Sequence, residues 1–280
     1  MKPLDDKKKV WFAVGAIVLI AVIVFGAFVV GKNLGGGNDE TSNGSSASAP
    51  TTQDSPAGEG SNNGNGEAAE DKFGQSDADI FGRNIKVPKN GVGVPLTKEA
   101  PDTNSTCDVK DKQPATIQVS HSMQTLWSEK SGPSNVDDSV PAGYAHSPEG
   151  AMMAAWNGNA LQYHGGDTLK PVLEKLFTGP NATQKLESIP AGPIPSMGST
   201  TEMQAPSAFR ITSCNEERVI GDIAMPMPTD SEGNPDKKTW GVIRVSAVWK
   251  DGDWKAELDE VEQPIEDEVS NLDGWSQWTF

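Results

Sequence analysis

Residues 143–157, GYAHSPEGAMMAAWN, decide how the folded part of this 280-residue chain is interpreted. His146, Ser147 and Glu149 are residue types that could serve a hydrolytic or proton-transfer site. The same residues also suit a helix start. Ser147 is a favourable N-cap, Pro148 fits the first helical position, and Glu149 favours the positive end of the helix dipole. Apolar residues then follow at helical spacing: Met152, Trp156, Ala160 and Tyr163. We therefore predict a helix here rather than a catalytic constellation.

Two more helices are expected downstream. Gly165 and Gly166 end the first helix, because glycine commonly terminates helices. A second helix begins at Asp167 or Thr168 and stops at Gly179, and one of its faces is apolar: Leu169, Val172, Leu173, Leu176 and Phe177. A third, weaker helix spans about residues 182–189.

Strand patterns flank these helices. Residues 115–127, ATIQVSHSMQTLW, alternate with period two and predict one half-buried strand, followed by a loop over residues 131–143. Residues 207–214 and 217–227 are two later strand candidates. Residues 239–261 predict a hairpin, because Asp251-Gly252 separates two strand-like runs. The order predicts an α+β domain over residues 114–280, in which two or three helices pack on a curved antiparallel sheet.

The N-terminal part predicts a membrane anchor. Residues 10–30, VWFAVGAIVLIAVIVFGAFVV, contain no charge and no proline, and as a helix they would be about 31 Å long. A cleaved signal peptide is the alternative, but its apolar core is usually shorter and a small-residue cleavage motif is missing. Three lysines directly precede the span, so the positive-inside rule places residues 1–9 in the cytoplasm and the C-terminal domain outside.

The segment after the span is rich in Gly, Ser and Asn. Residues 31–72 have almost no large apolar side chains, which predicts a flexible tether with a reach of roughly 35 Å. Residues 73–113 mix hydrophobic residues with Gly and Pro. We expect them to form an extended arm that is fixed to the domain by Phe81 and Ile85.

Charge and cysteine content limit the function. A net charge of −16 argues against nucleic-acid binding, which needs a basic surface. Ten of the acidic residues lie between Asp251 and Asp273. They form a solvated surface, a docking face for a basic partner or a loose divalent-ion site, although no D-x-D-x-D-G loop indicates a specific calcium site. Cys107 and Cys214 would both lie outside the cell, where disulfides persist. We expect them to pair, with two free thiols as the alternative.

Two stretches carry a family resemblance. Residues 125–157, TLWSEKSGPSNVDDSVPAGYAHSPEGAMMAAWN, place a Gly-aromatic-Ala-His-Ser-Pro-x-Gly-Ala run before an apolar helix, and residues 272–280 are LDGWSQWTF. Over about residues 113–278 the chain resembles actinobacterial membrane-anchored proteins that are often linked with mobile elements. Its topology also resembles the bridging subunits of conjugative and type IV secretion systems. The resemblance implies a nuclear transport factor 2-like (cystatin-like) extracytoplasmic domain.

The candidate site residues have structural alternatives. Tyr144, His146, Tyr163 and Asp222 could converge in the pocket of such a domain, since related folds use Asp or Tyr in proton transfer. His146 could equally fix its loop to the domain. Trp275 and Trp278 are candidates for partner contact, or they could close the open end of the domain. We assign no catalytic residue, metal ligand or cofactor.

These observations favour a non-catalytic assembly subunit of an envelope-spanning conjugation or secretion machine. Its partners would be other membrane or envelope proteins, with homo-oligomers left open, and its attachment would be residues 10–30. The alternative is an extracytoplasmic small-ligand or cell-wall-binding module that uses the cavity of the domain.

Overall fold

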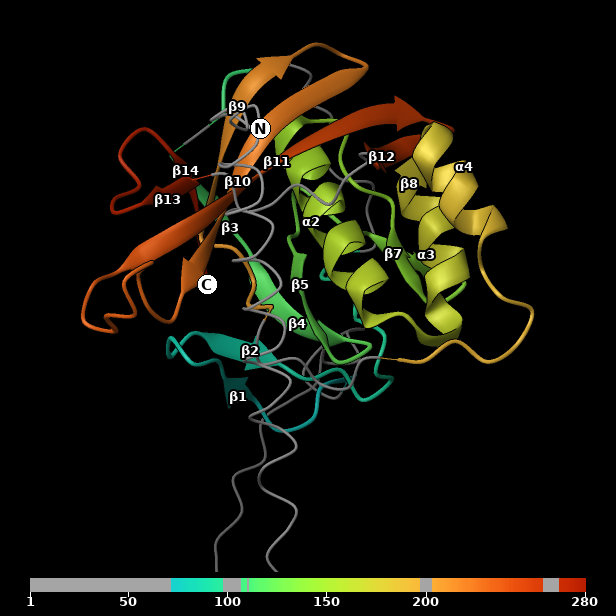
Figure 1. Cartoon of the computed structure of the whole chain (residues 1–280), viewed down its shortest axis with the longest axis horizontal. Helices are drawn as coiled ribbons and strands as arrows, with labels where there is room; N and C mark the ends of the chain where they lie inside the picture. The colour runs from blue at the N-terminus through green and yellow to red at the C-terminus, as the bar shows by residue number, and fades with distance from the viewer. Residues whose placement is uncertain (1–71, 98–106, 110, 197–202, 259–266) are drawn as a thin grey trace, which may run out of the picture. The chain divides into compact units, whose positions relative to one another are not determined.

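The computed structural model describes residues 72–97, 107–109, 111–196, 203–258 and 267–280 (Figure 1). The predicted span and residues 31–71 of the predicted tether lie outside them. Among the described residues, no helix is both long enough and apolar enough to cross a membrane. This part of the chain is α+β, with three α-helices and two larger, curved sheets of mixed strand direction.

Helix α2, Pro148–His164, is the centre of the fold and starts where the sequence predicts. Ser147 is extended, and its Oγ accepts a hydrogen bond from the Gly150 backbone N–H at 3.2 Å. The helix is buried on nearly all sides down to Leu161, because β5, α3, β11 and β12 surround it. Gly165, at φ 70°, ends it. A short 3₁₀ turn, η2 (Gly166–Thr168), leads into α3 (Leu169–Leu176), and α4 (Pro180–Glu187) follows.

The larger sheet follows the helices and has the strand order β3-β14-β9-β10-β11-β12-β8, with β13 also paired to β11. Its long central strands form antiparallel hairpins. Asp251 and Gly252, at φ 57° and 84°, make the predicted turn between β11 and β12. Two edge pairings, β12 with β8 and β14 with β3, are parallel, so the expected purely antiparallel sheet is wrong in this respect. The strand bounds are β3 Lys112–Pro114, β8 Phe177–Thr178, β9 Ala208–Cys214, β10 Arg218–Met227, β11 Thr239–Lys250, β12 Asp253–Glu257, β13 Asp267–Val269 and β14 Ser276–Thr279.

The two faces of this sheet have different neighbours. Gly221 of β10 faces α2 closely: a Cβ there would lie 2.7 Å from the Met152 Sδ, so only glycine fits without displacement. Ile223, two residues on, lies in the same core as α2. Asp222, between them, projects to the opposite face. A second, smaller apolar cluster around Trp275 covers part of that face.

A smaller sheet, β1-β2-β4-β5, corrects a prediction. Residues 115–127 form two strands rather than one, β4 (Thr116–Ser120) and β5 (Met123–Trp127). His121 and Ser122, at φ 49° and 66°, turn the chain between them. In the same way, β6 (Asn135–Asp137) and β7 (Val140–Ala142) form a hairpin where the sequence predicts a loop.

Residues of the predicted arm supply β1 (Asp77–Ala78) and β2 (Asn84–Lys86), and β2 pairs in parallel with β4. Ile85 is buried, whereas Phe81 is 37% exposed. Farther along, the Gln118 side chain binds both the N–H and the C=O of Val94, each at 2.8 Å. These two buried hydrogen bonds fix the arm to the domain.

Candidate functional site

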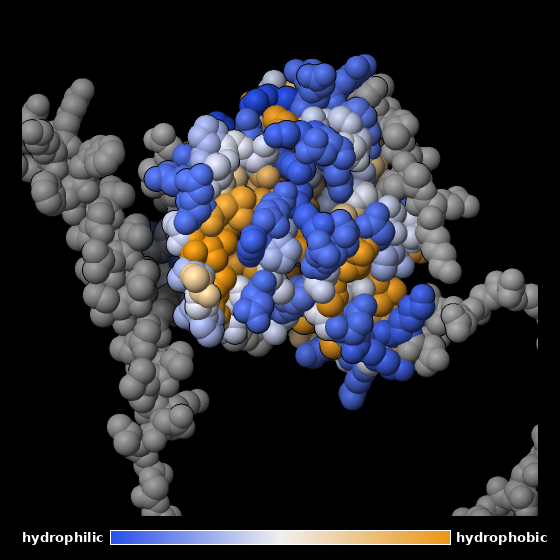
Figure 2. Space-filling model, turned by 90° about the vertical axis from the view of Figure 1, so that its right-hand side faces the viewer, coloured by the Kyte–Doolittle hydropathy of each residue, from blue (hydrophilic) through white to orange (hydrophobic). Residues whose placement is uncertain are grey.

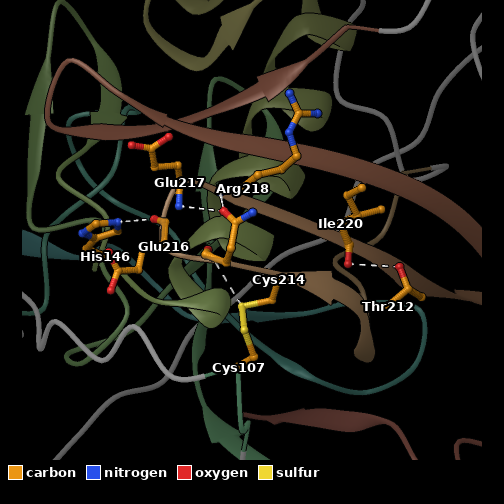
Figure 3. Close-up of a disulfide and its surroundings, with 9 residues drawn as sticks. Cys107, His146, Thr212, Cys214, Glu216, Glu217, Arg218 and Ile220 are labelled. Atoms are coloured by element: carbon orange, nitrogen blue, oxygen red, sulfur yellow. Dashed lines mark hydrogen bonds between the residues drawn. A yellow bond between two sulfur atoms is a disulfide. The ribbon is translucent and has the colours of Figure 1, made fainter.

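His146 joins the loop before α2 to two other parts of the fold. Its Nε2–H donates to the Glu216 carbonyl oxygen at 2.6 Å, in the turn between β9 and β10 (Figure 3). Its ring stacks on Trp249 with the ring centroids 3.9 Å apart and meets the edge of Trp254. Trp254 in turn donates its Nε1–H to the Ala145 carbonyl oxygen at 2.8 Å. The described polar and aromatic contacts of His146 are therefore all with other parts of the protein.

Tyr144 points into the core rather than into an open pocket. It is 3% exposed, and its hydroxyl oxygen accepts a hydrogen bond from Asn157 Nδ2 at 3.0 Å. Asn157 also binds both backbone groups of Leu126 in β5, as acceptor from N–H at 2.8 Å and as donor to C=O at 2.9 Å. Burial raises the pKa of Tyr144 far above its ordinary value, so the phenol stays neutral. The residue fixes α2 to β5.

Asp253 is a structural carboxylate that the sequence analysis missed. It accepts hydrogen bonds from the backbone N–H groups of Gly143 at 2.7 Å and Tyr144 at 3.0 Å, and also from its own neighbour Trp254. Burial raises the pKa of Asp253, although these three donors oppose the rise. The only sequence signal was its place directly after the Asp251-Gly252 turn, which says nothing of a partner 110 residues away.

Tyr163 and Asp222 lie away from this loop. Tyr163 is 42% exposed near the C-terminal end of α2, whose 17 residues span about 25 Å. Asp222 projects from the sheet face that points away from α2. There it binds Arg210 at 2.7 Å and Arg244 at 2.8 Å. Burial alone would raise the pKa of Asp222, but hydrogen bonds and charge from the two arginines lower it overall.

Trp275 and Trp278 are 5% and 4% exposed. The Trp275 ring lies in the smaller apolar cluster, with the Arg210 guanidinium 4.7 Å from its centroid. Trp278 packs on Phe209, with 4.7 Å between the ring centroids. In this structure both rings cover the sheet, and they leave little surface for a partner.

Cys107 and Cys214 form a disulfide that closes a separation of 107 residues, with their Cα atoms 5.7 Å apart. Cys214 is the last residue of β9, next to the turn that holds His146 (Figure 3). The disulfide thus ties the segment around Cys107 to the same turn that binds the α2 loop. We call this junction, made by the disulfide, His146, Glu216 and Trp249, the turn brace.

The arrangement is suited to rigidity. Hydrogen bonds, stacking and a covalent bond converge on one end of the sheet from segments far apart in sequence. Among the residues that the structure describes, no group of three His, Cys, Asp or Glu side chains is placed to hold a metal ion.

Comparison with known proteins gives one match. Residues 86–277 match the model of a family described as a domain of unknown function, DUF8175. The match covers more than half of the 280 residues. No curated protein and no solved structure matches the chain.

Proposed function

The chain belongs to the DUF8175 family, and we propose that it is a non-catalytic, membrane-anchored assembly subunit of an envelope-spanning conjugation or secretion machine. It acts through protein contacts of its extracytoplasmic domain, which residues 10–30 attach to the membrane. One observation carries the proposal: the residues with catalytic potential lie apart, and those in the interior are held in structural contacts.

Proton transfer requires its acid and base within hydrogen-bond reach of one substrate position, at about 2.6–3.2 Å. Tyr144 is buried against Asn157, whereas Asp222 lies on the sheet face that points away from α2. His146 uses Nε2 to hold the Glu216 carbonyl. The ligand-binding alternative has the same difficulty, because Tyr144 is 3% exposed and its hydroxyl is bonded to Asn157. The nearby Asp253 carboxylate is held by backbone N–H groups of the same loop.

Three features support the location and the class of machine. A disulfide persists in oxidising compartments, which favours a domain outside the cytoplasm. The uncharged stretch 10–30, preceded by lysines, favours a single span with the N-terminus inside. The three helices followed by the long antiparallel strands β9–β12 support the resemblance to bridging subunits of secretion systems.

The surface suits protein contacts. Figure 2 shows the side that carries α3 and α4, where hydrophobic areas alternate with hydrophilic ones. Leu169, Leu186 and Ile189 of this part of the chain are half-buried against the core. Interfaces of reversible complexes are about as apolar as the rest of a protein surface, so a surface of this composition is compatible with such a contact without singling one out.

The proposal is tested by exchanging the anchor in the native host. In one variant an unrelated apolar span of equal length replaces residues 10–30; in the other a cleavable signal peptide replaces them, so that the domain is exported but released. We expect the unrelated span to support DNA transfer or protein export and the released domain to fail. Full activity of the released domain would refute an anchored subunit.

A second experiment distinguishes a role in assembly from a catalytic role. Asp222→Asn keeps the shape of the side chain and one acceptor oxygen, so one of the two arginines keeps its hydrogen bond while the other faces the amide NH2. A non-catalytic subunit should then keep its activity in proportion to the amount of folded protein. A variant that is folded and abundant but inactive, with an intact complex, would indicate chemistry at this residue instead.

A further inference from the structure

An exposed, proline-rich segment runs from α4 back to the C-terminal end of α2. Residues 189–196 read IPAGPIPS, and Pro190, Pro193 and Pro195 are all exposed. Figure 1 shows this segment leaving α4 and returning to the end of α2. We call residues 190–195 the proline strap.

The two ends of the proline strap are fixed to the domain. At its start, the Ile189 N–H donates to the last turn of α4 at 3.2 Å, and the Ile189 side chain packs on the core. At its end, the Pro195 carbonyl accepts from the Gly166 N–H at 3.1 Å, and Gly165 pairs with Ser196 in an isolated β-bridge. A Cβ on Gly165 would lie 2.8 Å from the Pro195 oxygen, so glycine permits this close approach. The strap is therefore held in place while its prolines face solvent.

Covalent geometry restricts the backbone of the proline strap. Each proline ring fixes φ at about −65°, and the residue before a proline is pushed toward extended or polyproline II backbone. The chain bends at Ala191 and Gly192 and then continues without a bend through Pro193, Ile194 and Pro195. The N–H groups of Ala191, Gly192 and Ile194 have no acceptor among the described residues. A fixed φ and a solvated backbone without internal hydrogen bonds are the properties of polyproline II.

The chemistry of the proline strap limits the kind of partner it can bind. Residues 188–196 carry no charge, although 22% of the residues of the chain are charged. Nucleic acids and anionic lipids require basic groups, and membrane insertion requires large apolar side chains. The exposed residues here are proline, alanine, glycine and serine. Proline-rich segments of this kind instead dock in grooves that aromatic side chains line.

We propose that the proline strap binds an aromatic-lined groove of another envelope protein as a short polyproline II ligand. Binding orders little additional chain, because the prolines and the fixed ends have already ordered this segment. Tyr163 is 42% exposed and lies two residues before Gly165, so an exposed aromatic ring and the strap share one end of α2. The inference rests on the proposed assembly role and deepens it, because it names the surface through which one partner is held.

The test cross-links the proline strap of the full chain in native cells. A photoreactive phenylalanine analogue replaces Gly192, where an added Cβ meets no atom within 4 Å, and exposed Gln184 of α4 is the matched control position. We expect position 192, and not position 184, to form adducts with one envelope protein. The attached peptide of that protein should contain Trp, Tyr or Phe beside the site of attachment. No adduct, an adduct with a second copy of this chain or with lipid, or equal yields from both positions overturns the inference.

Proline variants distinguish recognition from simple stiffening of the loop. P193A with P195A should lower the adduct yield about fivefold or more, whereas P190A, before the bend, should leave it within about twofold of wild type. Urea unfolding midpoints of these variants should stay close to wild type, because the hydrogen bond from Gly166 uses a backbone carbonyl that alanine keeps. An unchanged yield in the double variant overturns the inference.

Native gels report the assembly role separately. A large complex that forms without any adduct from the proline strap would refute this docking and keep the assembly subunit. A proline-dependent adduct, in cells whose transfer or export does not depend on this chain, would keep the docking and refute the role in the machine.

Discussion

Asn157 gives the sharpest test of the interior that surrounds the candidate residues. It is fully buried, and its amide is bonded to the N–H and C=O of Leu126 and to the hydroxyl of Tyr144. Replacing Asn157 by Ala leaves three buried polar groups without that partner. Because water cannot easily reach them, each should cost close to its full desolvation penalty.

The magnitude follows from these contacts. At about 1–1.5 kcal/mol for each orphaned group, N157A should lower the free energy of unfolding by roughly 3–4.5 kcal/mol. This is a large share of the usual stability of a domain, about 5–15 kcal/mol. Y144F removes only one acceptor and should cost about 1 kcal/mol. In the Y144F background, N157A should cost roughly 1 kcal/mol less than in wild type, since one orphaned group is gone.

The assay is urea unfolding of a fragment from Lys72 to Phe280, followed by tryptophan fluorescence. The matched control is Asn159→Ala on the same helix, where a partly buried amide bonds within the helix, and a loss below about 1 kcal/mol is expected. If N157A and N159A shifted the midpoint equally, or if the double mutant were additive, the proposed buried network would be wrong.

Four further outcomes are expected. Reduction of the disulfide, or C107S with C214S, should lower stability by up to about 4–5 kcal/mol in unfolding curves, since the bond closes a long loop. H146A should cost about 1–2 kcal/mol in the same curves, because a hydrogen bond and a ring stack are lost, whereas Y163A should cost below about 0.5 kcal/mol. The pKa of Asp222 is lowered in the folded protein, so the ionised carboxylate stabilises the fold fully at pH values above the ordinary Asp pKa of about 3.9. This stabilisation is lost as the pH falls through the lower pKa of the folded protein. D222N should therefore make the free energy of unfolding fall less steeply on the acid side of a stability–pH curve. Any loss of transfer activity in H146A should match the loss of folded protein on immunoblots.

Each of these outcomes has a contrary result. A reducing agent should not affect the double serine variant, and an unchanged midpoint in reduced wild type would contradict the brace role of the disulfide. An H146A protein as stable as wild type but inactive would point to chemistry at the histidine. An acid limb that D222N leaves as steep as in wild type would contradict the ion-pair assignment.

Local sequence signals predicted the elements whose causes are local. Ser147 and Pro148 set the start of α2 because a cap and a fixed φ act within one turn, and Asp251-Gly252 set the β11–β12 turn for the same reason. The pairing of Cys107 with Cys214, the two cysteines of the chain, was expected and is present.

The hairpins were missed where the turn lacks its usual residues. His121 and Ser122 adopt positive φ without glycine, so a period-two pattern that runs through them hid the turn between β4 and β5. The parallel edge pairings could not be predicted either, because β3 and β14 come from segments more than 160 residues apart.

The sequence identified candidate residues by their chemical type, but it did not predict which residues they contact. His146 binds Glu216, 70 residues on, and Asp253 binds the loop backbone from 110 residues away. Contacts between residues so far apart in sequence depend on how the curved sheet packs on α2. No local sequence pattern predicts them. Burial of Trp275 and Trp278 depends on the same packing.

The central claim is that this chain works as part of a larger envelope assembly. It is tested most directly by cross-linking in intact native cells, mild detergent extraction and native gel separation of the 29.7-kDa chain. We predict that most of the protein migrates in one complex several times larger, together with other envelope proteins, and that the released domain does not. Migration of all the protein as a single chain, in cells that still carry out transfer or export, would contradict the claim.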